Sequence, residues 1–375
     1  MKIGINLLYL LPGVVGGTEI YAAGLLYALA QVNEQDEFIV FVNRESKNWS
    51  IPEAQNFNRV VCPLQATRRG RRYFFEQLRL PRLLTKYKID VVHSLGYVGP
   101  LFAPCPSVVT IPDLNYIALK HNMPNRRRIA LRFSSTKSAQ RANRVITISN
   151  FSKREISRSL KLTPDKITVT HLGPIMDGNT NSSENWAELK NRYGIQERYV
   201  VAFGGGSLHK NIHRLIQAFA LVKDEFPHFL MLIGRIPSNV DLSAESIGRG
   251  VRDRIIITGY VPRDHIRPLL SLADLFVLPS LYEGFGLPVL EAQQAAVAVA
   301  CSTAGSLPEV GGDGALYFYP NSVENIAQTI RHCLADDELR SQLILKGQEN
   351  LKRFSWKKTA IETLAVYHEI YHSKT

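Results

Sequence analysis

Short apolar runs, each followed by a segment of helix length, recur along the N-terminal half of the chain. The first run, KIGIN, ends in a glycine-containing loop, and apolar residues at helical spacing follow from about residue 19 to residue 32. Further runs are EFIVFV, RVVCPL, DVVHSLG, SVVTIPD and RVITIS, with helix-length segments at 73–87 and 126–141 between them. Apolar runs without period-2 alternation favour strands covered on both faces, as in a parallel sheet. The pattern therefore predicts an α/β domain.

The same pattern restarts after a polar stretch, GNTNSSENW at 178–186, which has the composition of a linker. The second series of runs is YVVAFGGG, HFLMLIG, DRIIITGYV and ADLFVLPS, with helices expected at 211–225 and from about residue 265. Two such series predict two doubly wound domains, at 1–177 and 178–355, that face each other across a deep cleft, because ligands bind at the carboxyl edges of such sheets. Apolar residues at helical spacing in the tail predict a C-terminal helix, at 356–375, that crosses back to the N-terminal domain.

Length and composition agree with two folded domains. A chain of 375 residues is longer than one ordinary hydrophobic core can serve. Its contents of 45% hydrophobic and 21% charged residues are close to the averages for globular proteins. The four cysteines are scattered without metal-ligand spacing, so we expect buried thiols and neither a disulfide framework nor a zinc site. The first 17 residues resemble a signal peptide but are interrupted by polar residues, proline and glycine, and no apolar run reaches the length of a membrane span. We therefore expect a cytoplasmic location.

The positive charge is confined to the N-terminal half. Residues 1–180 carry 25 Lys/Arg and 12 Asp/Glu, whereas residues 181–375 carry 20 and 21. Much of the excess lies in RRGRR at 68–72, in NRRR at 125–128 and in the run 132–144. Two interpretations stay open: scattered solvated faces, or a surface for an anionic partner such as a membrane, a phosphorylated lipid or a nucleic acid.

The strongest candidate chemistry lies in PSLYEGFGLPVLEAQ, residues 279–293. Two glutamates, Glu283 and Glu291, stand eight residues apart around a glycine-rich turn. The run LFVLPS predicts a strand before the turn, and Pro288 suits the first residue of a helix after it, because its missing N–H is not needed there. The segment therefore predicts a strand, a glycine turn and a helix start.

This geometry suits a ligand that has both phosphate and hydroxyl groups. Gly284 and Gly286 allow close approach of the backbone, and the N–H groups of 285–287 at a helix start form a ready anion site. Carboxylates are strong acceptors for paired hydroxyls, so Glu283 and Glu291 would bind a sugar and a ribose diol. A nucleotide diphosphate sugar has all of these groups. The alternative is a capping glutamate and an exposed helical glutamate.

The segment PSLYEGFGLPVLEA resembles the E-x7-E signature of the retaining nucleotide-sugar glycosyltransferases of family 4 (group 1), which have the GT-B fold. The resemblance extends over nearly the whole chain, in order and at suitable spacing. The other segments that carry it are PGVVGGTEIYAAGLLYAL, RVITISNFSKREI, SLHKNIHRLIQAF, IIITGYV, STAGSLPEVGGDGALYF and FSWKKTA. It implies two Rossmann-like domains, with acceptor bound by the first and donor by the second.

The resemblance implies roles for particular residues of the second domain. Glu283 would contact the donor sugar, Glu291 would bind the ribose, and Lys210 would neutralise the diphosphate as it leaves. Tyr260 and Val261 would border the base through their backbone. Backbone amides would hold the sugar and the β-phosphate in the segment that consists of Gly284, Phe285, Gly286 and Leu287.

In the first domain, the resemblance implies that Gly16 and Gly17 let the diphosphate and the acceptor approach, and that Asp113 is a catalytic residue. Two departures stand out: Pro112 replaces a histidine before Asp113, and Ser207 stands where many members have an arginine. Either another residue, such as His93 or His209, takes over these contacts, or the donor geometry differs. His93 as a plain strand-end histidine is the equal alternative.

The chemistry implied is metal-independent transfer without a cofactor. Fixed donors and a lysine stabilise the charge that develops on the leaving diphosphate, and the diphosphate itself takes the acceptor's proton. The sequence also offers no DxD-like carboxylate cluster in a plausible loop. We expect a hexose donor, UDP-glucose or a similar UDP-hexose first and GDP-mannose next, and a glycan or lipid-linked acceptor in polysaccharide biosynthesis.

Three other functions remain as alternatives. The first is a phosphorylase or epimerase of the same two-lobed fold, and the second is a sugar-nucleotide-binding protein without transferase activity. A nucleic-acid-binding protein would explain the basic half, but it explains neither the glutamate pair nor the lack of any nucleic-acid-binding signature. We therefore expect no nucleic-acid partner, and peripheral contact of the basic domain with the inner face of an anionic membrane.

Overall fold

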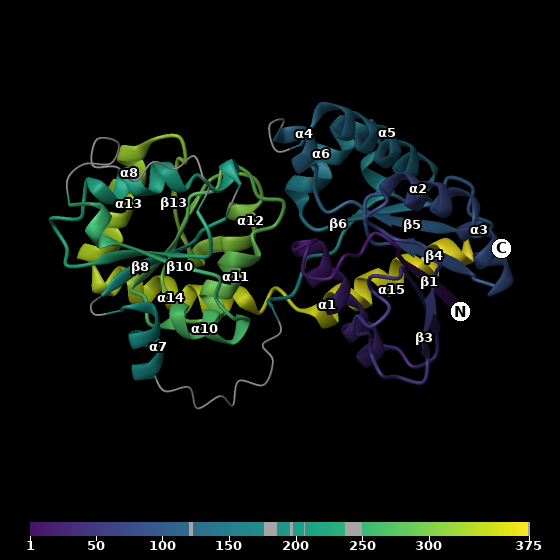
Figure 1. Cartoon of the computed structure of the whole chain (residues 1–375), viewed down its shortest axis with the longest axis horizontal. Coiled ribbons are helices and arrows are strands. Elements are labelled where there is room, and N and C mark those ends of the chain that lie inside the picture. The colour runs from purple at the N-terminus through teal and green to yellow at the C-terminus, as the bar shows by residue number, and fades with distance from the viewer. Residues whose placement is uncertain (120–122, 176–185, 196–197, 206, 237–249, 374–375) are drawn as a thin grey trace. The chain divides into compact units, whose positions relative to one another are not determined.

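The computed structural model describes residues 1–375 except 120–122, 176–185, 196–197, 206, 237–249 and 374–375. Backbone contacts divide the chain into two compact units (Figure 1). The N-terminal unit consists of Met1–Gly173 together with Phe354–Thr375, and the C-terminal unit consists of Pro174–Arg353. The polar stretch predicted as a linker falls almost wholly outside the described residues.

The N-terminal unit is built on a seven-stranded parallel sheet in the order β3-β2-β1-β4-β5-β6-β7. The strands are β1 (Lys2–Leu7), β2 (Glu37–Val42), β3 (Phe57–Val61), β4 (Val91–Ser94), β5 (Ser107–Thr110), β6 (Arg144–Thr147) and β7 (Ile167–Val169). The chain runs outward from β1 to β3 on one side and from β4 to β7 on the other. The order therefore reverses between β1 and β4, the position at which ligands bind in doubly wound sheets.

Helices cover both faces of this sheet. They are α1 (Gly17–Val32), α2 (Arg69–Leu78), α3 (Leu80–Lys86), α4 (Asn115–Ala118), α5 (Asn125–Arg141), α6 (Asn150–Leu160) and α15 (Trp356–His372). The C-terminal helix α15 packs against α1, and Gly24 of α1 makes this possible because a Cβ there would lie 2.3 Å from the Trp356 ring. Residues 356–372 thus form part of the N-terminal unit, next to the first helix of the chain.

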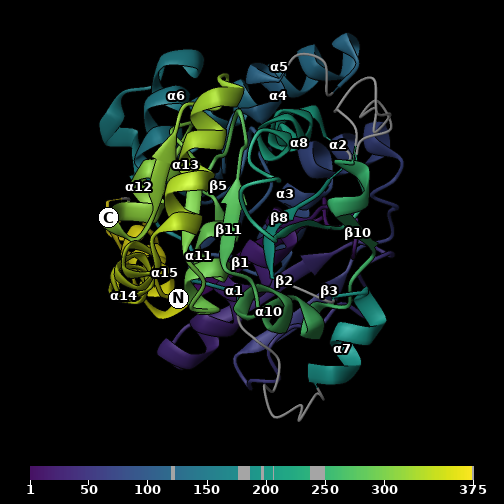
Figure 2. The same ribbon diagram turned by 90° about the vertical axis from the view of Figure 1, so that its left-hand side faces the viewer.

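The C-terminal unit repeats the design with six parallel strands in the order β10-β9-β8-β11-β12-β13. They are β8 (Tyr199–Phe203), β9 (Phe229–Ile233), β10 (Ile255–Gly259), β11 (Leu275–Leu278), β12 (Val299–Ser302) and β13 (Leu316–Phe318). Here the order reverses between β8 and β11, which lie side by side in Figure 2. The four inner strands β8, β9, β11 and β12 consist mostly of buried residues, as the absence of alternation predicts for a sheet covered on both faces, whereas the edge strands β10 and β13 are mostly half-buried.

Two helical layers enclose the second sheet. Its helices are α7 (Trp186–Tyr193), α8 (Ile212–Ala220), α10 (Arg263–Ser271), α11 (Leu287–Gln294), α12 (Leu307–Gly311), α13 (Val323–Ala335) and α14 (Asp337–Leu351). One buried cluster joins α8 and α13 to the sheet, and a second joins α10 and α11 to the opposite face (Figure 2). Within the described part of the chain, no helix combines the length and apolar content needed to cross a bilayer.

Two helical boundaries differ from the sequence-based prediction. The segment 73–87 forms two helices, since α2 ends at Leu78 and α3 begins at Leu80 with Pro81 in its first turn. The helix expected at 211–225 ends at Ala220 and continues as turns. Neither difference changes the order of strands.

Candidate functional site

An ion pair lies at the carboxyl edge of the second sheet, where the strand order reverses. Lys210 follows β8 and Glu283 follows β11, and the Lys210 Nζ donates to Oε1 of Glu283 at 2.8 Å. The hydroxyl of Ser280 donates to the same oxygen at 2.8 Å, while no described residue donates to Oε2. The two side chains are only 22% and 13% exposed, so the pair is partly shielded from water. One carboxylate oxygen is thus fixed and the other can accept a ligand hydroxyl.

The backbone of Glu283 is held by hydrogen bonds from the segment before α12. The Ser306 N–H and its hydroxyl both donate to the Glu283 carbonyl at 3.1 Å, and the same hydroxyl reaches the Phe285 carbonyl at 2.7 Å. Gly305 lies against this loop with φ +67°, and a Cβ there would stand 2.3 Å from the Glu283 carbonyl oxygen. Only glycine fits that position, because both the clash and the left-handed backbone exclude a side chain.

The Lys210 loop is held equally firmly. Asn211 adopts a left-handed conformation with φ 59°, and its buried amide donates to the carbonyls of Pro279 and Pro320 at 3.0 and 2.8 Å. The Leu281 N–H donates to the His209 carbonyl at 2.7 Å. These bonds join the loop after β8 to the loop after β11, so the ion pair is set by backbone anchors as well as by its own attraction.

Helix α11 begins next to this pair. Gly286 precedes it with φ 103°, a conformation that favours glycine, and Pro288 is the second residue of the helix, one position later than predicted. The positive end of the helix dipole therefore lies a few residues after Glu283, where anions are stabilised. Gly284 and Phe285 belong to the connecting turn, and Leu287 is the first residue of the helix. Glu291 lies on the second turn of α11 and is half-buried.

The remaining predicted donor residues lie at the same sheet edge. Ser207 and His209 are half-buried residues in and beside the short turn that carries Lys210. Burial and the neighbouring Lys210 charge lower the pKa of His209, which keeps this imidazole neutral at neutral pH. Beyond β10, Tyr260 is 85% exposed, whereas Val261 is buried.

In the N-terminal unit, the predicted glycine loop follows β1. Gly16 caps α1 with φ 56° and Gly17 is the first residue of that helix; a Cβ at either position would meet nothing within 4 Å. The loop is fastened by Glu19, whose carboxylate accepts hydrogen bonds from the Gly13 N–H at 2.8 Å and from the Trp49 indole at 3.0 Å. The loop therefore presents open backbone at the point where the first sheet reverses its order.

Asp113 follows β5 at the carboxyl edge of the first sheet. Its carboxylate accepts hydrogen bonds from the Tyr97 hydroxyl at 3.0 Å and from the Asn115 N–H at 3.1 Å. Pro112 beside it is buried, and its carbonyl accepts a bond from Thr147 at 3.2 Å. The aspartate is half-buried.

The structure decides against a ligand-facing role for His93. Its imidazole is fully buried at the end of β4, where Nδ1 lies 2.6 Å from the Tyr367 hydroxyl and Nε2 lies 2.7 Å from the Thr110 hydroxyl. Burial lowers the pKa of His93 to about 3, so the ring stays neutral. The alternative, a plain strand-end histidine, is correct, because both ring nitrogens are used inside the unit.

Comparisons with known proteins agree with this architecture. A family model described as glycosyl transferases group 1 matches residues 187–350, and one described as glycosyltransferase family 4 matches residues 15–173. Over 364 residues the chain is 31% identical to the O-antigen chain mannosyltransferase B of Escherichia coli, with 92% of this chain and 94% of that protein covered. The chain belongs to the family 4 (group 1) glycosyltransferases.

Solved structures show that this glycosyltransferase has the GT-B fold. Sucrose-phosphate synthase from Thermosynechococcus elongatus superposes with a TM-score of 0.75 at 19% identity, and each chain is covered completely. Anabaena HepE in complex with UDP-glucose superposes with a TM-score of 0.72 at 19% identity, with 98% of this chain and 100% of that chain covered. The predicted fold class of two Rossmann-like domains is confirmed.

The residues of this glycosyltransferase that support the ion pair were not predicted from the sequence. Ser280 and Ser306 bond to Glu283, and Gly305 packs beneath it. All three lie inside segments that carry the family resemblance, yet small polar residues and glycines occur in most loops, so their pattern alone gave no sign of this contact. Among the described residues, no three His, Cys, Asp or Glu side chains gather as a metal site would require.

Proposed function

We propose that the enzyme transfers mannose from GDP-mannose, with retention of the anomeric configuration, to a growing polysaccharide of the O-antigen type. The choice of mannose is supported by the 31% identical relative, which is named an O-antigen chain mannosyltransferase and aligns with 92% of this chain. UDP-glucose is the competing donor, because the sequence motifs do not discriminate between bases. The structures bound to UDP-glucose are too distant in sequence to decide between the two.

The observation that carries the proposal is the Lys210–Glu283 pair at the strand-order reversal of the second sheet. An ammonium group and a helix N-terminus next to each other form a site for a diphosphate. Oε2 of Glu283, which accepts no bond from the described residues, would receive a hydroxyl of the donor sugar. On binding, Lys210 would turn from Glu283 to the phosphates or bridge both groups. Glu291 would accept the ribose hydroxyls, and the backbone of Tyr260 and Val261 would border the base.

In the proposed reaction, the bond between C1 of mannose and the β-phosphate oxygen breaks, and a bond from C1 to an acceptor hydroxyl oxygen forms on the same face. The electron pair of the broken bond goes to the diphosphate, which also takes the acceptor's proton. Lys210 and the first amides of α11 stabilise the growing negative charge without reorganisation, the most effective form of electrostatic catalysis. We propose that these groups do this without a divalent metal or cofactor, and that Asp113, Gly16 and Gly17 border the acceptor.

The test is a donor screen with the purified enzyme, an oligomannoside acceptor and an excess of EDTA. We expect transfer from GDP-mannose, at least about tenfold faster than from UDP-glucose, and an α-linked product by NMR, which indicates retention because the donor sugar is α-linked. Faster transfer from UDP-glucose would overturn the donor, a β-linked product would overturn retention, and an absolute need for metal would overturn the metal-independent step.

A further inference from the structure

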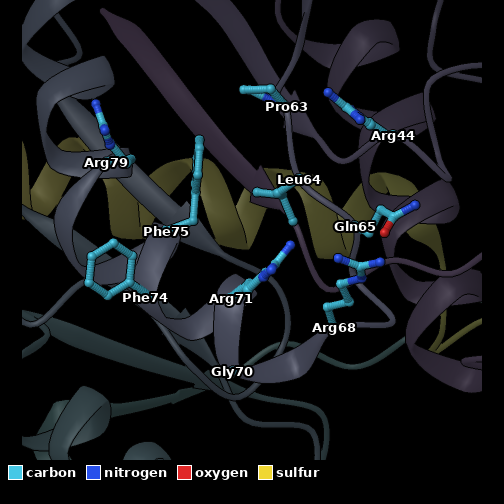
Figure 3. A pocket seen from close by; sticks show the side chains of 10 residues that line it. All are labelled: Arg44, Pro63, Leu64, Gln65, Arg68, Gly70, Arg71, Phe74, Phe75 and Arg79. Atoms are coloured by element: carbon cyan, nitrogen blue, oxygen red, sulfur yellow. The ribbon is translucent and has the colours of Figure 1, made fainter.

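A pocket of about 640 Å³ lies beside α2 in the N-terminal unit (Figure 3). It is formed by the loops after β2 and β3 and by one side of α2. Because both loops follow parallel strands, the pocket lies at the carboxyl edge of the sheet, on the far side of β1 from the strand-order reversal. It is therefore separate from the Gly16 loop and from Asp113.

Four arginines dominate the lining of the pocket. They are Arg44, Arg68, Arg71 and Arg79, and no Asp or Glu lines the pocket. All four side chains are exposed, and none makes an ion pair or hydrogen bond with a carboxylate of the described residues. Arginine guanidinium groups present paired donors that match phosphate oxygens. Four of them in one pocket indicate a multiply charged anion.

The rest of the lining is apolar. Figure 3 shows Leu64 between the side chains of Arg71 and Arg44, with Phe74 and Phe75 towards Arg79. Leu64 is 6% exposed, whereas Phe74 of α2 is 63% exposed although Phe75 beside it packs against the core of the unit. An exposed phenylalanine next to arginines suits a ligand that has both a charged group and a hydrocarbon part.

Hydrogen bonds join the two loops that form the pocket. Glu45, next to Arg44, accepts hydrogen bonds from the Ala66 and Thr67 N–H groups at 3.1 and 3.3 Å and from the Thr67 hydroxyl at 3.0 Å. These bonds tie the loop after β2 to the loop that leads into α2, and they lower the pKa of the Glu45 carboxyl against the effect of burial. Glu45 thus stays ionised and bonded to backbone, and the arginines are left for a ligand.

We propose that this pocket binds the diphosphate and the first hydrocarbon units of an amphiphilic lipid diphosphate. The diphosphate accepts hydrogen bonds from Arg44, Arg68 and Arg71, and the hydrocarbon chain lies over Phe74 and Phe75. The identification of this lipid as the carrier of the acceptor glycan rests on the proposed function, whereas the binding itself does not. It would place the charged end of the acceptor at the outer strands of the first sheet and leave the glycan free to reach further along the same edge.

The test is isothermal titration calorimetry of the full chain with farnesyl diphosphate below its micelle concentration, and no sugar donor present. Two probes separate the sources of phosphate: inorganic pyrophosphate, and vesicles of phosphatidylglycerol. The double variant Arg68→Gln/Arg71→Gln removes two pocket charges. Its matched control, Arg154→Gln/Arg158→Gln, removes two exposed charges from α6 of the same unit.

We expect farnesyl diphosphate to bind at least about tenfold more tightly than pyrophosphate, because the apolar lining adds to the arginine contacts. The pocket variant should weaken binding by at least about tenfold and the control by less than about twofold. The inference would be overturned if farnesyl diphosphate did not bind, or if it bound no more tightly than pyrophosphate. It would also be overturned if both double variants lost the same affinity for farnesyl diphosphate, or if the pocket variant lost only its binding to vesicles. A chain that binds the lipid but transfers no sugar would instead refute the proposed function.

Discussion

The two sheets of this protein carry charge at their carboxyl edges in opposite ways. In the C-terminal unit, Lys210 and Glu283 neutralise each other at 2.8 Å and are mostly shielded from water. In the N-terminal unit, the arginines of the pocket beside α2 are exposed and have no carboxylate partner among the described residues. At two buried groups of this unit, His93 and Glu76, burial shifts the pKa in the direction that favours the uncharged side chain.

This difference suits two ligands of different kinds. A paired site on anchored loops would need only a movement of the Lys210 side chain when a small donor binds, so that little reorganisation is needed at the moment of reaction. An open basic pocket instead attracts a large anion and holds it through several exposed contacts whose strength depends on salt. In our proposal, the same fold would thus serve chemistry at one edge and attachment at the other.

The largest effect should come from removing the cation of the paired site. Lys210→Ala should lower kcat for mannosyl transfer by about 10²–10³-fold, since one lost transition-state contact of this kind has such an effect. Lys346→Ala, an exposed lysine on α14 of the same unit, is the control and should leave kcat unchanged. A decrease in kcat of less than about tenfold in Lys210→Ala would contradict the catalytic role that we propose for the paired site.

The next effect concerns how firmly the paired site is built. Gly305→Ala should lower the free energy of unfolding by about 2–4 kcal/mol, because its Cβ would lie 2.3 Å from the Glu283 carbonyl oxygen in a left-handed backbone. Gly194→Ala has the same φ of +67° but meets nothing within 4 Å, so it should cost only about 1–2 kcal/mol. Urea unfolding measures both, and equal losses would show that the Glu283 loop is not anchored there.

In the N-terminal unit, the buried His93 should make stability depend on pH. Its pKa of about 3 lies below the ordinary value of 6.5, so its contribution is complete above about pH 6.5 and decreases as the pH falls towards 3. In this range the unfolded chain binds a proton that the folded chain does not, so the free energy of unfolding decreases by up to about 1.4 kcal/mol for each pH unit. His93→Asn should have a flatter dependence of unfolding free energy between about pH 6.5 and 4.5. An identical slope in the variant would mean that His93 titrates normally.

The smallest effect should come from Glu76, with the opposite sign. Burial raises its pKa to about 7, although Arg72 lies 3.8 Å away, so its contribution to stability is complete below about pH 4.5 and is lost as the pH rises through 7. Glu76→Gln should therefore gain about 1 kcal/mol relative to wild type as the pH rises from about 5 to about 6, because each pH unit between the two pKa values changes the unfolding free energy by up to about 1.4 kcal/mol. Thermal unfolding of both proteins at both pH values measures this difference. A variant that becomes less stable relative to wild type at the higher pH would show that the carboxylate is stabilised by Arg72.

Much of the fold follows from the sequence, because runs of apolar residues without alternation identify strands of a parallel sheet. The strand order and its reversal points follow less directly, since they depend on crossovers that the pattern does not encode. Lys210 and Glu283 lie 73 positions apart, and only the family resemblance linked them before the structure brought them together.

Other features could not be predicted, for physical reasons. His93 was equally compatible with a ligand site and with burial, because the same strand end serves both; its partner Tyr367 comes from 274 positions away. The pocket beside α2 was visible only as a run of arginines. A charge run does not reveal whether its members converge, and the two loops that make them converge are joined by Glu45.

The measurement that tests the central claim most directly is hydrogen exchange of the full chain with and without GDP-mannose. The account predicts slower exchange in segments 207–216 and 280–294, which contain Lys210, Glu283 and Glu291, and unchanged exchange in segment 63–79 of the arginine pocket. Protection of 63–79 without protection of 280–294 would contradict the assignment of the donor to the C-terminal unit.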